Sequence, residues 1–254
     1  MLDCAPWGTL LVTTDGVIDG VHARWAVEGP EAFGYKAVAR GLSDVAAMGG
    51  EPLWAVLAAC LPKGCTEEHA HALYRGAEKT GCALVGGDTS FGPTPHVVAT
   101  VLGRAHAKGP VLRSGARPGD WIVVTGRLGG SLESGRHATF TPRVAEARAL
   151  MDACDVSAII DVSHGLSTDL MHVLEASRAG CRLEAALLPL HRGATLENAL
   201  NDGEDYELLA TVRPGDLPAG FTRIGAITDG AALLVHGDGR TTPLVAGGWE
   251  HGRS

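Results

Sequence analysis

The sequence lacks the features that mark membrane, secreted and nucleic-acid-binding proteins. No apolar stretch reaches the roughly 18 residues that a membrane-spanning helix needs. The N-terminus has no basic segment followed by a long apolar run, so we expect no signal peptide. The 21 Lys and Arg are outnumbered by 29 Asp and Glu and form no cluster, which argues against a generic nucleic-acid surface. We therefore expect a cytoplasmic protein that binds neither nucleic acid nor a membrane.

Paired cysteines and aromatic residues are also scarce. The six cysteines are scattered without a Cys-x-x-Cys pair, which favours buried free thiols over a metal site. Glycine is abundant, with 35 among 254 residues, and indicates many tight turns and close backbone approaches. The content of 45% hydrophobic and 20% charged residues is that of a soluble globular protein. The length allows one large domain or two moderate ones.

Strands and helices alternate along both halves of the chain. Pro30 opens a helical pattern that stops at Gly49-Gly50, and Thr66 can cap a second helix. In the first half we expect helices at Pro30–Met48 and from Thr66 to near Gly81, and strands at Thr9–Thr14, Leu53–Leu61, Ala83–Val85 and Val97–Gly103. After a linker at Lys108–Asp120, we expect a helix from Pro142 to about Cys154 and strands at Trp121–Thr125, Ala158–Ile160, around Leu183, Tyr206–Val212, Thr222–Ile227 and Ala232–His236. This alternation predicts an α/β or α+β protein with two domains.

Four polar stretches carry the chemistry. In Asp161–Leu170 an apolar run ends in a polar turn and a helical pattern begins at once, a natural arrangement for ions and phosphates. Acidic turns also occur at Thr13–Asp15, Leu42–Asp44 and Gly86–Thr89. One such aspartate alone would more simply cap a turn. We interpret the four together as converging to hold metal ions and a nucleotide.

A family resemblance rests on seven motifs that occur in family order over nearly the whole chain. They resemble thiamine-monophosphate kinase, of the aminoimidazole-ribonucleotide synthetase and selenophosphate synthetase superfamily. The motifs are Thr-Thr-Asp-x5-Gly-Val-His (13–22), Gly-Tyr-Lys-Ala (34–37), Leu-Ser-Asp-Val-Ala-Ala-Met-Gly (42–49), Val-Gly-Gly-Asp-Thr-Ser-Phe-Gly-Pro (85–93), Arg-Ser-Gly-Ala-Arg-Pro-Gly-Asp (113–120), Asp-Val-Ser-His-Gly-Leu-Ser-Thr-Asp-Leu (161–170) and Gly-Glu-Asp-Tyr-Glu-Leu (203–208).

The resemblance implies a fold and an activity. The fold would be an N-terminal domain, residues 1–112, with a ferredoxin-like βαββ core that forms a homodimer, followed by a C-terminal α/β domain, residues 113–254. The activity would be transfer of the γ-phosphate of ATP to thiamine monophosphate, with magnesium, to give thiamine diphosphate. No catalytic side-chain base is expected, because the acceptor phosphate is already anionic near neutral pH.

The resemblance also implies roles for individual residues. The metal ligands would be Asp3, Thr13, Thr14, Asp15, Asp44, Asp88 and Asp161. ATP would be bound by Arg113, Ser163, the backbone at Gly86 and Gly87, and Tyr74, with Tyr35 as a further nucleotide contact. Thiamine monophosphate would be bound by His22, Glu204 and Trp249. Each has a simpler alternative: a surface loop for His22, a solvated turn for Glu204, a pin for the C-terminal tail for Trp249, and helix packing for Tyr35 and Tyr74.

Three departures from the family pattern leave other functions open. Leu2-Asp3 keeps one carboxylate of a paired Asp-Asp, and the C-terminal half is shorter than usual after Thr125. Ser163-His164-Gly165 replaces Ser-Asp-Gly, whose aspartate is a magnesium ligand, and imidazole is a poor magnesium ligand. We predict that His164 either binds a phosphate as a cation or leaves an outer metal position empty. The alternatives are an ATP-using enzyme with another small acceptor and a non-catalytic nucleotide-binding relative.

Overall fold

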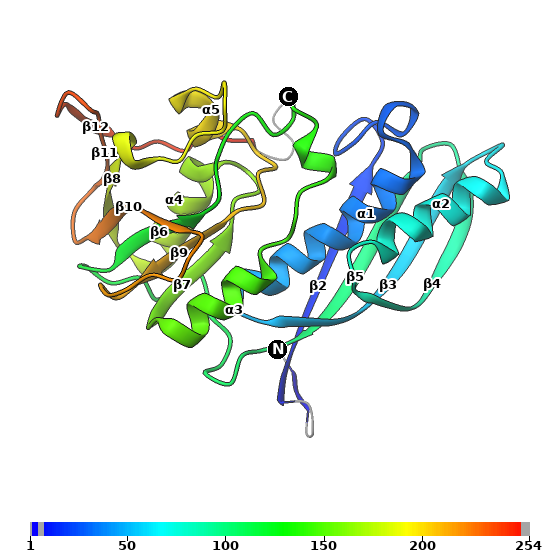
Figure 1. Cartoon of the computed structure of the whole chain (residues 1–254), viewed down its shortest axis with the longest axis horizontal. Helices are drawn as coiled ribbons and strands as arrows, with labels where there is room; N and C mark the ends of the chain where they lie inside the picture. Colours follow the sequence, from blue (N-terminus) through cyan, green and yellow to red (C-terminus); the bar gives the residue numbers. More distant parts are fainter. Residues whose placement is uncertain (1, 5–7, 250–254) are drawn as a thin grey trace.

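The computed structural model describes residues 2–4 and 8–249, which form two lobes that each contain one β-sheet (Figure 1). The described strands of the first lobe lie in the order β1-β2-β5-β3-β4, and those of the second in the order β12-β11-β8-β10-β6-β9-β7. Residues 105–120 connect the lobes without a helix or strand, so the expected domain boundary at residues 112 and 113 lies in this connection. In the described part of the chain, no helix is both long enough and apolar enough to cross a membrane.

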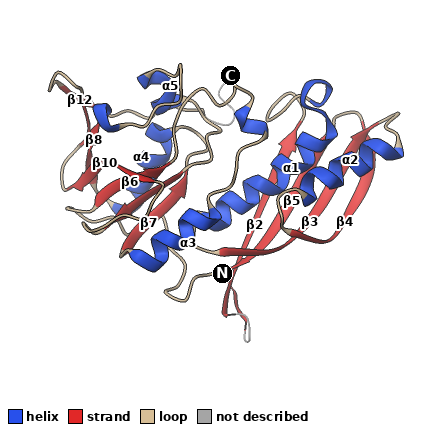
Figure 2. Cartoon of the chain, in the orientation of Figure 1, coloured by secondary structure: helices blue, strands red, loops and turns tan. Residues whose placement is uncertain are grey.

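The first lobe packs two helices on one face of its sheet (Figure 2). Its elements are β1 (Leu2–Cys4), β2 (Gly8–Ile18), α1 (Trp25–Ala46), β3 (Glu51–Pro62), α2 (Glu67–Glu78), β4 (Ala83–Gly92) and β5 (His96–Arg104). Because α2 carries the chain back across the sheet, β3 and β4 are parallel. The order β2-α1-β3-α2-β4-β5 therefore has one helix and one strand more than the implied βαββ core.

Residues in β2 alternate between two faces of the sheet. Leu11 and Val17 are buried in the core beneath α1, whereas Val12 and Ile18 are 58% and 39% exposed. Residues 13 and 15 share the parity of the buried pair and point toward α1. Thr14 points the other way, where its hydroxyl accepts a hydrogen bond from Thr100 at 3.1 Å. No described helix packs on that second face.

Local signals place the two helices as the sequence predicts. Gly29, with φ +77°, separates a first turn from the main body of α1, which starts at Pro30. In α2 the Thr66 hydroxyl accepts a hydrogen bond from the His69 amide, which confirms the predicted cap.

The second lobe surrounds a strand that is buried along its whole length. Its elements are β6 (Trp121–Thr125), η1 (Arg136–Ala138), α3 (Val144–Ala153), β7 (Val156–Asp161), α4 (Leu166–Ser177), β8 (Gly180–Glu184), η2 (Ala185–Leu187), α5 (Leu196–Asn201), β9 (Leu208–Val212), β10 (Phe221–Thr228), β11 (Ala232–Val235) and β12 (Thr241–Pro243). Strand β9 lies between β6 and β7, and its five residues are all buried. The carboxyl end of β7 leads directly into α4, which confirms the strand–turn–helix predicted at Asp161–Leu170.

The structure corrects three predictions of local structure. Thr13–Asp15 lies inside β2 and Gly86–Asp88 lies inside β4, so neither is a turn. Both strands continue because a neighbouring strand pairs with their polar residues as well as with their apolar ones. The described cysteines are free, but only Cys181 is buried and the other four are half-buried.

Candidate active site

Helix α1 carries three charged residues at a spacing of four along the surface that faces the second lobe. Residues four apart in a helix lie on one face, so Lys36, Arg40 and Asp44 form a single row about 12 Å long. Each meets a residue from another element: Lys36 contacts Glu204, Arg40 contacts Asp15, and Asp44 contacts Thr13. The site is built around this row.

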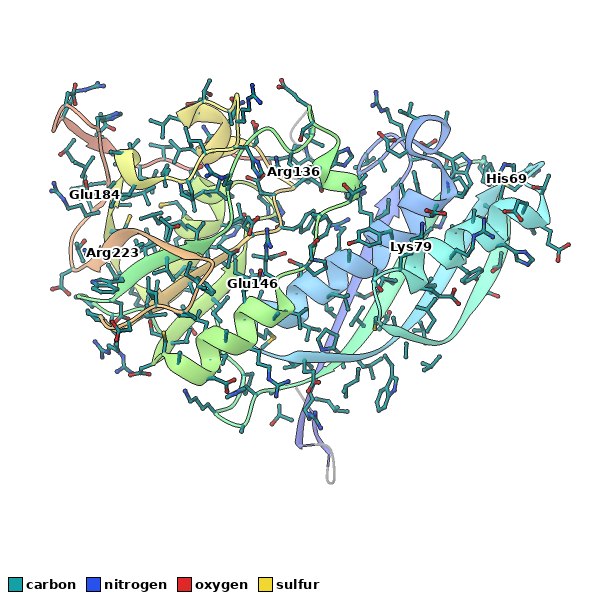
Figure 3. The ribbon with its side chains drawn as sticks, in the orientation of Figure 1. His69, Lys79, Arg136, Glu146, Glu184 and Arg223 are labelled. Carbon is teal, nitrogen blue, oxygen red and sulfur yellow. The ribbon has the colours of Figure 1, made fainter. Side chains whose placement is uncertain are left out.

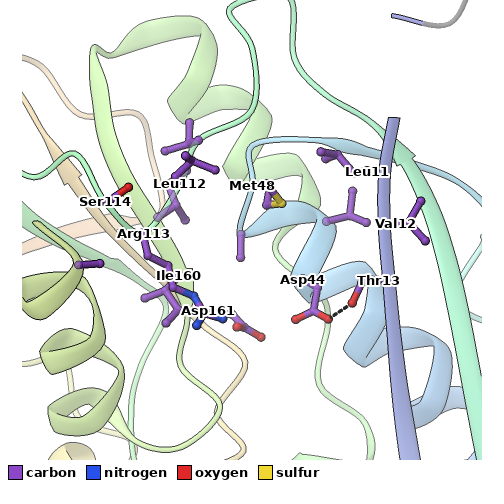
Figure 4. A pocket seen from close by; sticks show the side chains of 15 residues that line it. Leu11, Val12, Thr13, Asp44, Met48, Leu112, Arg113, Ser114, Ile160 and Asp161 are labelled. Carbon is purple, nitrogen blue, oxygen red and sulfur yellow. Dashed lines mark hydrogen bonds between the residues drawn. The ribbon is translucent and has the colours of Figure 1, made fainter. Parts of the chain in front are cut away.

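A cavity of about 430 Å³ lies between the lobes at the Asp44 end of the row (Figure 4). Thr13 and Asp44 line it from the first lobe, Asp161 from the second, and Arg113 from the connection between them. The Thr13 hydroxyl donates a hydrogen bond to Asp44, and the Ser43 hydroxyl donates one of 2.7 Å to Asp161. Four of the predicted ATP and metal residues therefore share one cavity.

The carboxylates around this cavity are crowded and largely removed from water. Burial, reinforced by the charge of Asp44, raises the pKa of Asp161 to about 7. Burial likewise raises the pKa of Asp15 to about 6, although the Arg40 guanidinium lies 3.0 Å away. The pKa of Asp44 is raised by burial as well. Burial is the largest cause of all three shifts, so these carboxylates are held largely out of water between the lobes.

The donors at this cavity fit magnesium, which prefers hard oxygen ligands and keeps several waters. Among the described residues, no three His, Cys, Asp or Glu side chains come close enough to hold a metal ion. These residues therefore fit an open magnesium site. In such a site Asp15, Asp44 and Asp161 would share the ions with phosphate and water oxygens, and protein ligands alone would not enclose them.

Several predicted residues lie away from this cavity. Strand β4 forms one edge of the first sheet, and β3 and β5 separate it from β2. Its register pairs Asp88 with exposed Ala58 and Gly87 with Leu57. A Cβ on Gly87 would meet the Leu57 carbonyl oxygen at 2.1 Å, so close strand packing alone requires glycine there. The structure thus does not bring Asp88, Gly86 and Gly87 to the cleft of their own chain.

Tyr74, Tyr35 and Asp3 are the remaining residues predicted to bind the nucleotide or a metal ion. The Tyr74 hydroxyl is 2.6 Å from that of Thr89, so Tyr74 links α2 to β4. The Tyr35 hydroxyl donates to the Phe140 carbonyl, as a packing role requires. Asp3 pairs with Thr9 across β1 and β2, but its side chain lies outside the described residues.

The turn between β7 and α4 is organised by a buried carboxylate. The amides of Ser163 and His164 both donate to Asp169 Oδ2 at 2.9 Å. The His164 ring lies 3.2 Å from Asp169 Oδ1, and this hydrogen bond raises the pKa of His164. The Trp249 ring stacks at 6.4 Å from the His164 ring, and its amide donates to the His164 carbonyl. His164 and Trp249 therefore pack against each other at the turn between β7 and α4.

Glu204, a predicted substrate residue, occupies a strained turn before β9. Glu204 and Tyr206 have φ of 67° and 52°, a region that non-glycine residues seldom adopt. The Tyr206 hydroxyl donates to Glu204 Oε1 at 3.0 Å, and the Lys36 ammonium forms an ion pair with Oε2. The same ammonium donates to the carbonyl of His22. The structure thus joins two predicted substrate residues, His22 and Glu204, through one lysine.

Lys36, Arg40 and His137 belong to this site but were not predicted from the sequence. The signal for the first two was the repeat of a charge every four residues within a helix that is otherwise apolar on that side. His137 lies in the loop after β6, and its contact with Lys36 depends on how the two lobes pack. No local pattern could have found it.

Comparison with known proteins identifies the family. Residues 1–105 match the family model described as AIR synthase related protein, N-terminal domain. The chain is 42% identical to a thiamine-monophosphate kinase of Rhodopirellula baltica, over 79% of this chain and 67% of that protein. It is 34% identical to the thiamine-monophosphate kinase of Escherichia coli K12, over 96% of this chain and 86% of that one. A crystal structure described as AaThiL complexed with AMPPCP and TMP superposes with a TM-score of 0.85 at 30% identity, over 95% of this chain and 87% of the other. The chain belongs to the thiamine-monophosphate kinase family.

Proposed function

We propose that this protein transfers the terminal phosphoryl group of ATP to the phosphate of thiamine monophosphate and releases thiamine diphosphate and ADP. The observation that carries the proposal is the convergence of Asp44, Asp161 and Arg113 on one interlobe cavity, on the same face of α1 as the pair Lys36–Glu204. Relatives of this family, covered over most of their length, carry that activity in their names, and one was crystallised with AMPPCP and TMP.

The chemistry requires positioning rather than a base. The acceptor is a phosphate monoester with a second pKa of about 6, so its oxygen is already a nucleophile near neutral pH. The barrier comes from bringing two anions together with the attacking and leaving oxygens in line. At 4 Å, two unit charges repel by about 4 kcal/mol at an effective dielectric of 20. Positive charge and fixed geometry are therefore what the site has to supply.

The residues on the two ends of the α1 row divide this task. At the cavity, Arg113 binds the phosphates of ATP, and Ser163 holds the nucleotide at the start of α4. At the other end, His22 and Glu204 bind thiamine monophosphate, with Trp249 at the mouth of the site. The row is about 12 Å long, so its two ends can hold different parts of the two substrates.

Magnesium, when bound, neutralises the phosphates and bridges them to the protein. Asp15, Asp44 and Asp161 would hold it from the cleft, with Thr13 beside Asp44, and Asp3, Thr14 and Asp88 complete the proposed ligand set. The raised pKa values of Asp15 and Asp161 support this role, because buried carboxylates that hold protons near neutral pH can exchange those protons for a cation.

A turnover assay tests the function. The purified protein is incubated with ATP, magnesium and thiamine monophosphate, and thiamine diphosphate and ADP are measured by chromatography. Parallel reactions replace the acceptor by thiamine, AMP or inorganic phosphate. We expect equal amounts of both products with thiamine monophosphate only. Folded protein that makes no thiamine diphosphate would refute the proposal, and ADP formed with another acceptor would assign a different substrate.

We also propose that the chain works as a homodimer formed through the uncovered face and the β4 edge of the first sheet. That surface exposes large apolar side chains, which monomers seldom do over an extended area. They are Val12, Ile18, Val85, Phe91 and Val98, which are between 36% and 61% exposed. Asp88 and Thr14 lie on the same surface, so a partner would place its Asp88 against residues that its own chain cannot reach.

Mixing two inactive variants tests the dimer and the shared site together. Sedimentation gives the mass of the unmixed protein, and Asp88→Asn is then mixed with Asp161→Asn after mild dissociation. If each site takes Asp88 from one chain and Asp161 from the other, random pairing restores roughly a quarter of the wild-type sites. No recovery in a confirmed dimer would mean that each site is complete within one chain.

A further inference from the structure

Lys36 is a fully buried charge in the described part of the site, and its surroundings use all its donors. Its side chain has no exposed area. An ammonium carries three N–H donors. One reaches the His22 carbonyl at 2.5 Å, one reaches His137 Nδ1 at 2.8 Å, and one forms the ion pair with Glu204. Burying such a charge is costly unless every donor is satisfied, and here every donor is.

The three acceptors come from three segments far apart in the sequence. His22 lies in the loop after β2, His137 in η1, and Glu204 in the turn before β9. Since lysine can only donate, His137 Nδ1 must accept, and the ring is therefore neutral with its proton on Nε2. Burial, followed by the charge of Lys36, lowers the pKa of His137, in agreement with a neutral ring. The lysine thus fixes one segment of the first lobe against two of the second.

The neighbours of Glu204 show that its orientation is specific. Asp205 is held inside the second lobe by the Gly129 amide and Arg136, and Glu207 by Thr125 and Arg143. Only Glu204 turns toward the first lobe. Its backbone keeps a positive φ because its amide donates to Ser163 and its carbonyl accepts from Ser131. Strain maintained in this way is characteristic of functional sites.

The Glu204 carboxylate still has capacity for a ligand. A carboxylate offers about four lone-pair positions, and Lys36 and Tyr206 occupy one each. The side chain is 17% exposed, whereas Lys36 is fully enclosed. Glu204 therefore lies between the buried cation and the open site, so that Lys36 can set its position without touching a substrate.

We propose that Lys36 is the positioning residue of the acceptor site: its ammonium fixes the carboxylate of Glu204 relative to the His22 loop across the two lobes. This proposal rests on the proposed function, in which His22 and Glu204 bind thiamine monophosphate. The nucleotide end of the row is not part of this network, because Asp44 and Arg113 have no contact with Lys36 among the described interactions. Loss of Lys36 should therefore affect the acceptor far more than ATP.

Steady-state kinetics of Lys36→Met test the proposal, with Lys79→Met as the matched control. Lys79 lies at the C-terminal end of α2 (Figure 3), in an exposed pair with Glu31 that takes no part in the Lys36 network. In Lys36→Met we expect the KM for thiamine monophosphate to rise tenfold or more, with the KM for ATP within twofold of wild type. Lys79→Met should leave both constants unchanged. Equal rises in both KM values, or a KM for thiamine monophosphate within twofold of wild type, would overturn the positioning role.

The double variant Lys36→Met/Glu204→Gln keeps the test valid if Lys36→Met alone does not fold. It removes the unpaired carboxylate together with its cation, so its stability should approach that of wild type more closely. If Lys36 acts through Glu204, the KM for thiamine monophosphate in the double variant will equal that in Glu204→Gln alone, because the lysine then has no carboxylate left to position. Rises that multiply would show that the two residues act independently, against the proposal.

The two failures can be told apart. Wild-type protein that does not phosphorylate thiamine monophosphate overturns the proposed function and this inference with it. Wild-type protein that does so, combined with an unshifted acceptor KM in Lys36→Met, overturns the positioning role alone.

Discussion

The two ends of the row on α1 handle negative charge in opposite ways. At one end, Glu204 meets a buried lysine that the protein itself supplies. At the other, Asp44 and Asp161 face one cavity, and burial raises the pKa of both carboxyl groups, with the charge of Asp44 adding to the shift at Asp161. The first end is neutral and rigid before any substrate arrives. The second is incomplete without an added cation. We infer that the acceptor end holds its substrate in a fixed geometry, and that the nucleotide end depends on a metal ion to neutralise charge.

The largest expected effect separates activity from stability at the nucleotide end. Asp161→Asn should lower kcat by about 10²–10³, the usual loss for one electrostatic contact to a transition state. The metal-free protein should keep its melting temperature or gain slightly, because the variant removes a buried charge but retains an acceptor for Ser43. Kinetics and thermal melts check both. A melting temperature many degrees below wild type would mean that Asp161 is structural.

The matching change at the acceptor end should behave in the reverse way. Glu204→Gln leaves Lys36 buried without a counter-charge, and breaking a buried pair typically costs about 3 kcal/mol or more. We expect a clear loss in the free energy of unfolding, measured with urea, together with a raised KM for thiamine monophosphate. The control is Glu31→Gln, which removes an exposed pair and should change stability by less than about 1 kcal/mol. Equal free energies of unfolding for Glu204→Gln and Glu31→Gln would contradict the view that the acceptor end depends on its buried ion pair.

How far the sequence predicts this arrangement depends on whether the signal is local. Thr66, Pro30 and the run Trp121–Thr125 carry their information within a few residues, and the predicted cap, helix start and strand agree with the structure. The short elements α5 and β12 were not predicted, although Thr195 caps α5 in the same way as Thr66 caps α2. Polar residues within β2 and β4 resembled turns because one face of each strand is not covered by a helix.

The placement of the site residues depends on sheet order, which no local pattern encodes. The family resemblance assigns Asp15, Asp44 and Asp161 to one site. In the structure these three residues lie near one another between the lobes. The same reasoning assigned Asp88 to this group. Strand β4 instead lies at the far edge of the sheet, which a reader of the sequence could not know without the pairing of β3 with β5 and β4.

The pH dependence of stability sharpens the comparison. The pKa of Asp161 is about 7 in the folded protein against 3.8 for a free side chain, so its protonated form is favoured by folding. That stabilisation is complete below pH 3.8 and is lost as the pH rises through 7. Between pH 5.5 and pH 8 the contribution of Asp161 to the stability of the metal-free protein should fall by on the order of 2 kcal/mol. Asp161→Asn should flatten this slope, and stability of the metal-free wild type that rises over this range would contradict the assignment.

Arg40 lies between the two ends and should have a smaller effect. Its guanidinium pairs with Asp15 and donates to the Gly16 carbonyl. In Arg40→Met, Asp15 loses its only described ion pair, so the metal-free protein should be destabilised by about 1 kcal/mol. Half-maximal activity should then need less magnesium, because no fixed cation competes for the carboxylate. Arg75→Met, which removes an exposed pair on α2, is the control; a higher magnesium requirement in Arg40→Met would oppose this role.

The smallest expected effect concerns His164, where the chain departs from its family at the nucleotide end. The imidazole lies beside the buried carboxylate of Asp169, which raises its pKa, so at neutral pH it carries part of a positive charge in an otherwise acidic region. His164→Asp would replace this cation by a carboxylate next to Asp169. Like charges at that distance should lower stability by about 1 kcal/mol in the absence of metal, and magnesium should reverse the loss if the new oxygen binds it. Activity measured across a magnesium titration should then show a steeper dependence than in wild type, with little change in maximal rate. Identical magnesium titration curves for His164→Asp and wild type would mean that residue 164 does not contribute to the charge balance at the nucleotide end. Arg40 would then be the cation that sets this balance.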